Sequence, residues 1–106
     1  MRNTRIRVPE LTPRGGLAEI RVMIMHPMET GFNSNSHGDL IPVDIITDFS
    51  CSFDGAEVLA IRLAPGLSAN PYFSFDIRAD RSGTLSFLWI DQQGVETRAT
   101  AGLVVG

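Results

Sequence analysis

Apolar residues recur at every second position along most of the chain. In the clearest run, Phe73, Phe75 and Ile77 alternate with Ser74 and Asp76. Successive side chains of a β-strand point to opposite faces, whereas a helix would scatter these three apolar residues around its surface. The same alternation recurs at 20–24, 49–53, 59–63 and 85–89. The pattern predicts strands near 4–11, 17–26, 46–53, 56–63, 72–79, 84–91 and 95–105.

Short turn sequences separate these runs. Asp54-Gly55 is the clearest, because a two-residue type I′ turn needs a positive φ at both positions. Residues 14–16, 80–83 and 91–94 have similar compositions. No stretch has the pattern of an amphipathic helix. We therefore predict an all-β fold, an immunoglobulin-like β-sandwich of about seven antiparallel strands, as a single domain over 1–106.

Two connections are longer than turns, at 26–45 and 64–70. If consecutive strands reverse direction, residues 26–32, 65–72 and 91–94 lie at one end of the sandwich, and the three tight turns lie at the other. Binding sites on sandwiches are usually loop clusters of this kind. Strand order thus predicts a functional surface at one end.

The long connection begins His26-Pro27-Met28-Glu29-Thr30-Gly31. His26 and Glu29 could form a general acid/base pair or two metal ligands, which would make the chain a small hydrolase. A metal site needs three or four ligands, and His37 is the only other histidine. In the alternative interpretation both side chains bond backbone groups while Pro27 and Gly31 fix the path of the loop. Because loops longer than about 12 residues in a small domain are usually functional or disordered, we favour a partner-binding loop.

The second long connection ends Asn70-Pro71-Tyr72. An Asn before Pro adopts an extended or turn conformation, and Tyr72 would begin a strand close to the long loop. A structural corner and a direct partner contact are both consistent with these three residues.

Leu88 and Ile90 make one predicted strand apolar on both faces, because Leu85, Phe87 and Trp89 already define its core face. A sheet that is apolar on both faces is covered on both faces. No predicted helix supplies the second cover, so we expect a partner protein to bury Leu88 and Ile90. Isolated surface hydrophobes, which proteins tolerate singly, are the alternative.

Composition narrows the function. The net charge of −3 argues against a nucleic-acid-binding surface. All nine basic residues are Arg, which suits interfaces but also follows from a GC-rich genome. The single cysteine, Cys51, is in phase with Phe49 and Phe53, which predicts a buried and unreactive thiol. No apolar run reaches the ~18 residues of a membrane span, and the basic N-terminus lacks the apolar stretch of a signal peptide.

Five motifs follow one another along nearly the whole chain: Asn3–Pro9, His26–Phe32, Gly38–Pro42, Asn70–Tyr72, and Ser82–Leu85 with Phe87 and Trp89. This combination resembles the SoxZ family.

The resemblance implies a non-catalytic subunit without cofactor or metal. SoxZ-like chains form a heterodimer with SoxY, which carries sulfur intermediates of thiosulfate and sulfur oxidation on a cysteine in its C-terminal arm. The resemblance also implies transient contacts with other sulfur-oxidation enzymes, periplasmic residence by co-export with SoxY, no membrane insertion, and possible homodimers when SoxY is absent. A cytoplasmic enzyme accessory and a subunit of a different carrier system remain open.

Overall fold

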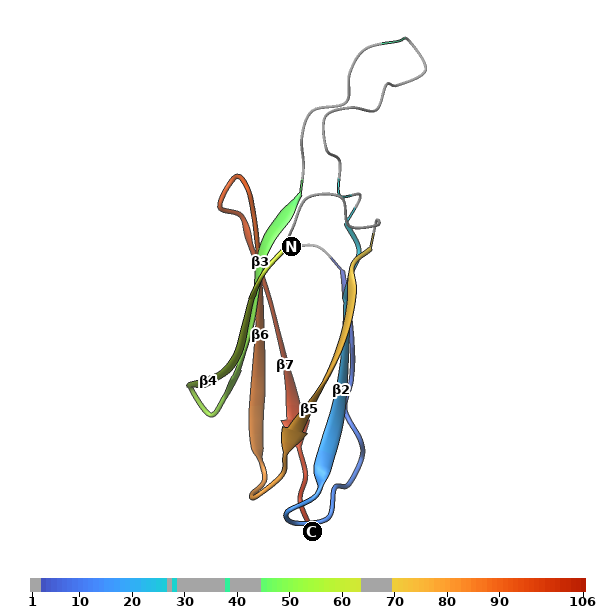
Figure 1. Ribbon diagram of the computed structural model, residues 1–106, viewed down its shortest axis with the longest axis vertical. Helices are drawn as coiled ribbons and strands as arrows, with labels where there is room; N and C mark the ends of the chain where they lie inside the picture. The colour runs from blue at the N-terminus through green and yellow to red at the C-terminus, as the bar shows by residue number, and fades with distance from the viewer. Residues whose placement is uncertain (1–2, 27, 29–37, 39–44, 64–69) are drawn as a thin grey trace.

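The computed structural model describes residues 3–26, 28, 38, 45–63 and 70–106, which form seven antiparallel strands in two facing sheets (Figure 1). The strands are β1 (Thr4–Arg7), β2 (Leu17–Ile24), β3 (Ile46–Phe53), β4 (Ala56–Arg62), β5 (Tyr72–Arg78), β6 (Gly83–Asp91) and β7 (Glu96–Leu103). One sheet has the order β1-β2-β5 and the other β4-β3-β6-β7. No helix in the described residues could cross a membrane. This is the predicted all-β, immunoglobulin-like sandwich.

The first strand is shorter than the sequence pattern predicts. β1 ends at Arg7 and not at position 11, because Pro9 has no N–H to donate to the ladder. The chain then crosses to β7's side, where Thr12 bridges Val105 in parallel. The Thr12 N–H donates to the Val104 carbonyl oxygen at 3.0 Å, and the two sheets are thereby linked beside the C-terminus.

The core lies between the sheets and follows the predicted alternation. Phe49 of β3 is at its centre: its ring centroid lies 5.6 Å from that of Phe73 in the opposite sheet and 5.1 Å from that of Trp89. Cys51, in the same phase, is fully buried. The other fully buried hydrophobic side chains come from both sheets and include Ile20, Val22, Ile24, Leu85 and Phe87.

Three tight turns form the end of the sandwich that we call the turn end, made of residues 13–16, 54–55 and 79–83. Asp54 and Gly55 have φ values of 47° and 88°, as a type I′ turn requires. The Thr84 N–H donates to Asp54 Oδ1 at 2.8 Å, and Arg81 forms an ion pair with the same carboxylate. These two contacts, the backbone one foremost, hold the pKa of Asp54 below its usual range. The turn end is thus closed by its own polar groups.

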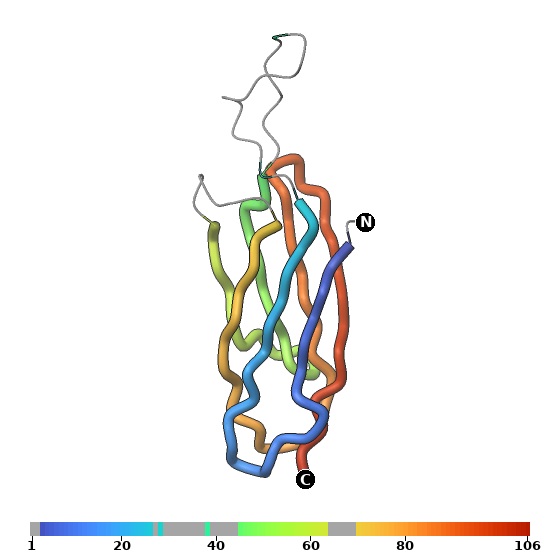
Figure 2. Tube along the Cα trace, turned by 90° about the vertical axis from the view of Figure 1, so that its right-hand side faces the viewer, coloured from blue at the N-terminus to red at the C-terminus, as the bar shows by residue number. Residues whose placement is uncertain are grey.

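The opposite end, which we call the loop end, holds His26, Met28, Ile45, Asn70 and residues 91–94. β2, β4 and β6 finish there and β3, β5 and β7 begin there (Figures 1 and 2). Backbone hydrogen bonds join the Asn70 N–H to the His26 carbonyl oxygen and the Gln92 N–H to that of Ile45. The described ends of the three connections therefore lie together, as strand order predicts.

Candidate protein-binding site

The loop end is locked by a reciprocal pair of hydrogen bonds between His26 and Asn70. The His26 N–H donates to Asn70 Oδ1 at 2.8 Å, and the Asn70 N–H donates to the His26 carbonyl oxygen at 2.6 Å. Asn70 has a φ of 54°, a left-handed conformation that Asn tolerates better than most residues. The lock fixes where the two long connections leave and re-enter the sandwich.

The His26 side chain is 2% exposed, and it contacts the backbone of the segment that follows it. Its Nδ1 accepts the Met28 N–H at 2.9 Å, which requires an unprotonated nitrogen there. Met28 is also buried, and its Sδ lies 3.3 Å from the donating N–H of Ile46. These contacts agree with the interpretation in which His26 bonds backbone groups.

The predicted partner of His26 in an acid/base pair, Glu29, lies outside the described residues, as do Pro27, Thr30 and Gly31. Within the described part of the chain, no three His, Cys, Asp or Glu side chains are grouped so as to hold a metal. The partner-binding role of these residues stays a prediction.

The sequence left two roles open for residues 70–72, a structural corner and a direct partner contact. The structure gives the first role to Asn70 and Pro71 and leaves the second open for Tyr72. Asn70 and Pro71 close the corner: Pro71 is buried, and its carbonyl oxygen accepts the Ile24 N–H at 3.3 Å. Tyr72 instead lies on the outer face of the β1-β2-β5 sheet and is 55% exposed. It stands opposite Met23 of β2 and is free to make an external contact.

Leu88 and Ile90 lie half-buried on the outer face of the β4-β3-β6-β7 sheet, opposite the buried Leu85, Phe87 and Trp89. β6 is therefore apolar on both faces, as predicted. In register, Leu88 lies between Ser50 and Arg98, and Ile90 lies between Asp48 and Glu96. We call these six outward residues the β6 outer face.

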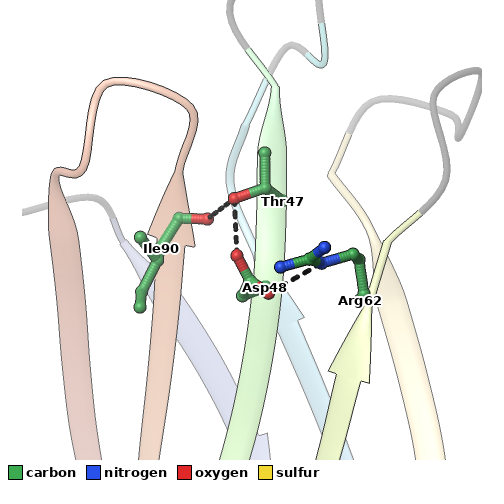
Figure 3. A network of polar contacts seen from close by, with 4 residues as sticks. All are labelled: Thr47, Asp48, Arg62 and Ile90. Carbon is green, nitrogen blue, oxygen red and sulfur yellow. Dashed lines mark hydrogen bonds and ion pairs between the residues drawn. The ribbon is translucent and has the colours of Figure 1, made fainter.

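A polar network borders this face at the loop end (Figure 3). The Thr47 Oγ1 hydroxyl lies 2.8 Å from Asp48 Oδ2 and 3.2 Å from the carbonyl oxygen of Ile90, both of which accept from it. Arg62 Nε lies 3.6 Å from Asp48 Oδ1. The strand register shifts between Ile46 and Asp48, so Thr47 is an extra residue that turns toward β6.

The network lines a hollow of about 520 Å³ beside Ile90. Its walls are formed by Ile45, Thr47, Asp48, Arg62, Leu63, Ile90, Asp91, Gln92 and Gly94. Sequence reasoning missed Thr47, Asp48 and Arg62, because only the bulge and the pairing of β3 with β4 and β6 bring them together. The hollow makes the β6 outer face continuous with the loop end.

Asp91 shapes the last turn of the loop end. Its Oδ1 accepts the N–H groups of Gln93 and Val95 at 3.0 and 2.9 Å. Gly94 has a φ of 82°, which the turn needs and Gly provides without strain. The Asp91 carboxylate therefore supports the 91–94 turn together with two backbone hydrogen bonds, from Asp91 to Val95 and from Gly94 to Asp91. The sequence indicated these residues only as a turn.

Cys51 has no exposed surface, and burial raises the pKa of its thiol to about 11. A thiolate is the nucleophilic form of cysteine, so this thiol is protonated and shielded at neutral pH. The predicted burial of Cys51 is confirmed.

Fold and site together place the chain among the all-β, immunoglobulin-like sandwich domains. Solved structures share this fold at low identity. A superoxide reductase (neelaredoxin) from Ignicoccus hospitalis has a TM-score of 0.75 and 19% identity, covering 97% of this chain and 80% of that one. The sulfur carrier protein SoxY from Chlorobium limicola f thiosulfatophilum has a TM-score of 0.68 and 17% identity, covering 97% and 78%. These likenesses establish the fold, which by itself does not determine function.

The family follows from the sequence itself. The family model described as sulphur oxidation protein SoxZ matches residues 6–102. The chain therefore belongs to the SoxZ family and takes part in the Sox system of sulfur oxidation. No curated protein matches the chain.

Proposed function

We propose that the chain is the non-catalytic subunit of a sulfur-carrier heterodimer. It pairs with a SoxY protein, whose cysteine-bearing C-terminal arm holds the sulfur intermediates during thiosulfate and sulfur oxidation. The match of the SoxZ family model over residues 6–102 is the observation that supports this function. The buried state of Cys51 agrees with it, because a thiol that is protonated and inaccessible is unsuited to carry sulfur.

The β6 outer face is the proposed SoxY-binding surface. Leu88 and Ile90 supply an apolar centre, and Arg98 and Arg62 flank it, each paired with an acidic residue at 2.6 and 3.6 Å. An apolar centre with a polar, Arg-containing rim is the usual anatomy of a protein interface. Without SoxY, the same face would pair two copies of this chain.

The loop end is proposed to meet the carrier arm or the enzymes that visit it. The His26–Asn70 lock would fix the start of the long connection, and Ile45 at its other end lines the hollow beside Ile90. Residence in the periplasm, after co-export with SoxY, belongs to the same proposal.

The test is co-purification with SoxY from the same genome. The double variant Leu88→Asp with Ile90→Asp should weaken pairing by at least about 30-fold, the loss expected when central interface residues worth about 2 kcal/mol are disrupted. Isothermal titration with purified SoxY measures the affinity, and circular dichroism verifies folding.

A matched control introduces the same charge elsewhere. Leu17 and Val104 are exposed hydrophobes far from the β6 outer face, so Leu17→Asp with Val104→Asp should leave pairing unchanged. A folded Leu88/Ile90 variant with wild-type affinity would remove the proposed face. Failure of the wild-type chain to pair with SoxY, or turnover by the isolated chain, would contradict the function itself.

A further inference from the structure

The outer face of the β1-β2-β5 sheet, turned toward the viewer in Figure 2, collects arginines near the loop end. Arg5 and Arg7 of β1 and Arg21 of β2 are all exposed on it. In register, Arg7 lies opposite Arg21, and Arg5 lies opposite Met23, which in turn lies opposite Tyr72. We call these five residues the cationic face.

The charges of the cationic face are not balanced within the fold. Arg21 Nε lies 2.5 Å from Glu19 Oε1, but neither Arg5 nor Arg7 has an ion pair in the part of the chain that the structure describes. Like charges directly opposite each other in an antiparallel pair are destabilising, and Arg7 and Arg21 are such a pair. Glu19 offsets this repulsion at Arg21 only, and Arg7 has no ion-pair partner among the described residues.

The acidic residues of this sheet lie farther toward the turn end. Glu19 and Asp76 face each other in the row beyond Arg21, and Glu10 follows β1. The chain as a whole has a net charge of −3. A cationic face on an acidic protein is thus a local feature, not a consequence of overall composition.

Two adjoining hollows open on this face. One, of about 260 Å³, is lined by Arg5, Ile6, Arg7, Arg21, Val22, Met23 and Tyr72. The other, of about 660 Å³, is lined by Arg7, Val8, Pro9, Glu10, Glu19 and Arg21. Arg7 and Arg21 border both hollows, and among the described residues the lining of the smaller one has three arginines and no acidic side chain. Arg, Tyr and Met are the residue types enriched in protein interfaces.

We propose that the cationic face binds an acidic segment of a partner protein, on the opposite sheet from the β6 outer face. Planar guanidinium groups pair with carboxylates in forked hydrogen bonds, which would satisfy Arg5 and Arg7. The exposed ring of Tyr72 and the thioether of Met23 add apolar contact, which a protein segment can use and a small inorganic anion cannot. This surface goes beyond the proposed function, since pairing with SoxY is assigned to the other sheet.

The first experiment titrates the ¹⁵N-labelled full chain with a short peptide rich in Asp, Glu and Phe. Backbone amide shifts should concentrate at the five residues of the cationic face. Arg5→Glu with Arg7→Glu should weaken peptide binding by about tenfold or more, and added salt should weaken it too. The control Arg14→Glu with Arg78→Glu makes the same charge change at exposed arginines near the turn end and should leave affinity within about twofold.

In this titration three results would overturn the proposal. They are no localised shifts, equal losses in the control variant, or the same shifts from sulfate alone at matched ionic strength, which would indicate a small-anion site. A second measurement separates this face from SoxY pairing. The Arg5/Arg7 variant should pair with SoxY normally, and the Leu88/Ile90 variant should bind the peptide normally. Loss of SoxY pairing in the Arg5/Arg7 variant would make the cationic face the SoxY surface and refute a separate site, while failure of wild-type pairing would refute only the proposed function.

Discussion

The two ends of the sandwich share one local arrangement, a positive-φ residue whose side chain accepts a backbone N–H, but its exposure to solvent differs between them. Asp54 at the turn end and Asn70 at the loop end both have a positive φ, 47° and 54°. Each side chain accepts a backbone N–H from a distant segment at 2.8 Å, that of Thr84 for Asp54 and that of His26 for Asn70. The Asp54 bond is exposed to solvent, whereas the Asn70 bond is partly buried. Water can therefore replace the first acceptor more readily than the second.

Replacing the loop-end acceptor should have the largest effect. Asn70→Ala leaves the His26 N–H without its acceptor, at about 1–3 kcal/mol, and places a less tolerant residue at positive φ, at about 1 kcal/mol more. We expect the free energy of unfolding to fall by about 2–4 kcal/mol in urea denaturation. Asn70→Gly, which keeps the conformation, should lose only the hydrogen-bond part. A loss no greater than that of Asp54→Ala would contradict the comparison.

At the turn end, we expect close packing at Gly83 to matter more than the exposed hydrogen bond of Asp54. A Cβ added at Gly83 would lie 2.6 Å from the Phe53 ring and from Asp54 Oδ2. Gly83→Ala should therefore cost about 1–3 kcal/mol, the usual range for overpacking. Gly102, in the neighbouring strand β7, has nothing within 4 Å of the same position. Gly102→Ala is the matched control, and equal losses in both variants would exclude packing as the cause.

Cys51 lies in the core between the two ends. The loss of unfolding free energy in a Cys51 variant is therefore a reference for the losses expected at each end. Cys51→Ala should cost about 1 kcal/mol and leave SoxY pairing and sulfur-dependent activity intact. Because burial raises the pKa of the thiol to about 11, its contribution to stability is present below the unfolded pKa of about 8.5 and is lost as the pH rises toward 11.

Alkylation of Cys51 at pH 8 should accordingly be slow in the native chain and fast in urea. Rapid alkylation under native conditions, or loss of sulfur-dependent activity in a folded Cys51→Ala chain, would reverse the assignment.

The smallest expected effect is the pH dependence of the turn end. The pKa of Asp54 is lowered by the Thr84 N–H and then by Arg81, so its contribution to stability is present above the unfolded pKa of about 3.9. It is lost as the pH falls through the lower folded pKa. In Asp54→Asn the stability curve should be flatter in this acid range, as thermal unfolding between pH 5 and 2 would reveal. An unchanged slope would mean that the carboxylate adds nothing.

Much of the fold could be predicted because its evidence is local. Alternating side chains identified five of the seven strands, β2 to β6, and Asp54-Gly55 identified its turn by the φ values it tolerates. Strand ends were harder to predict, because the strand expected at 4–11 stops at Arg7. The site was predicted in part, since the apolar pair Leu88 and Ile90 was visible in the sequence but the hollow beside Ile90 was not.

The sequence by itself determined which side chains face the core, the tight turns, the burial of Cys51 and the SoxZ family. Only the tertiary structure decided the neighbours across strands: Thr47 beside Ile90, Asn70 Oδ1 on the His26 N–H, and Arg7 opposite Arg21. The physical reason is that every strand offers the same backbone donors and acceptors. Strand pairing and register depend on packing between segments that are far apart in the chain. A local pattern of apolar and polar residues therefore does not predict them.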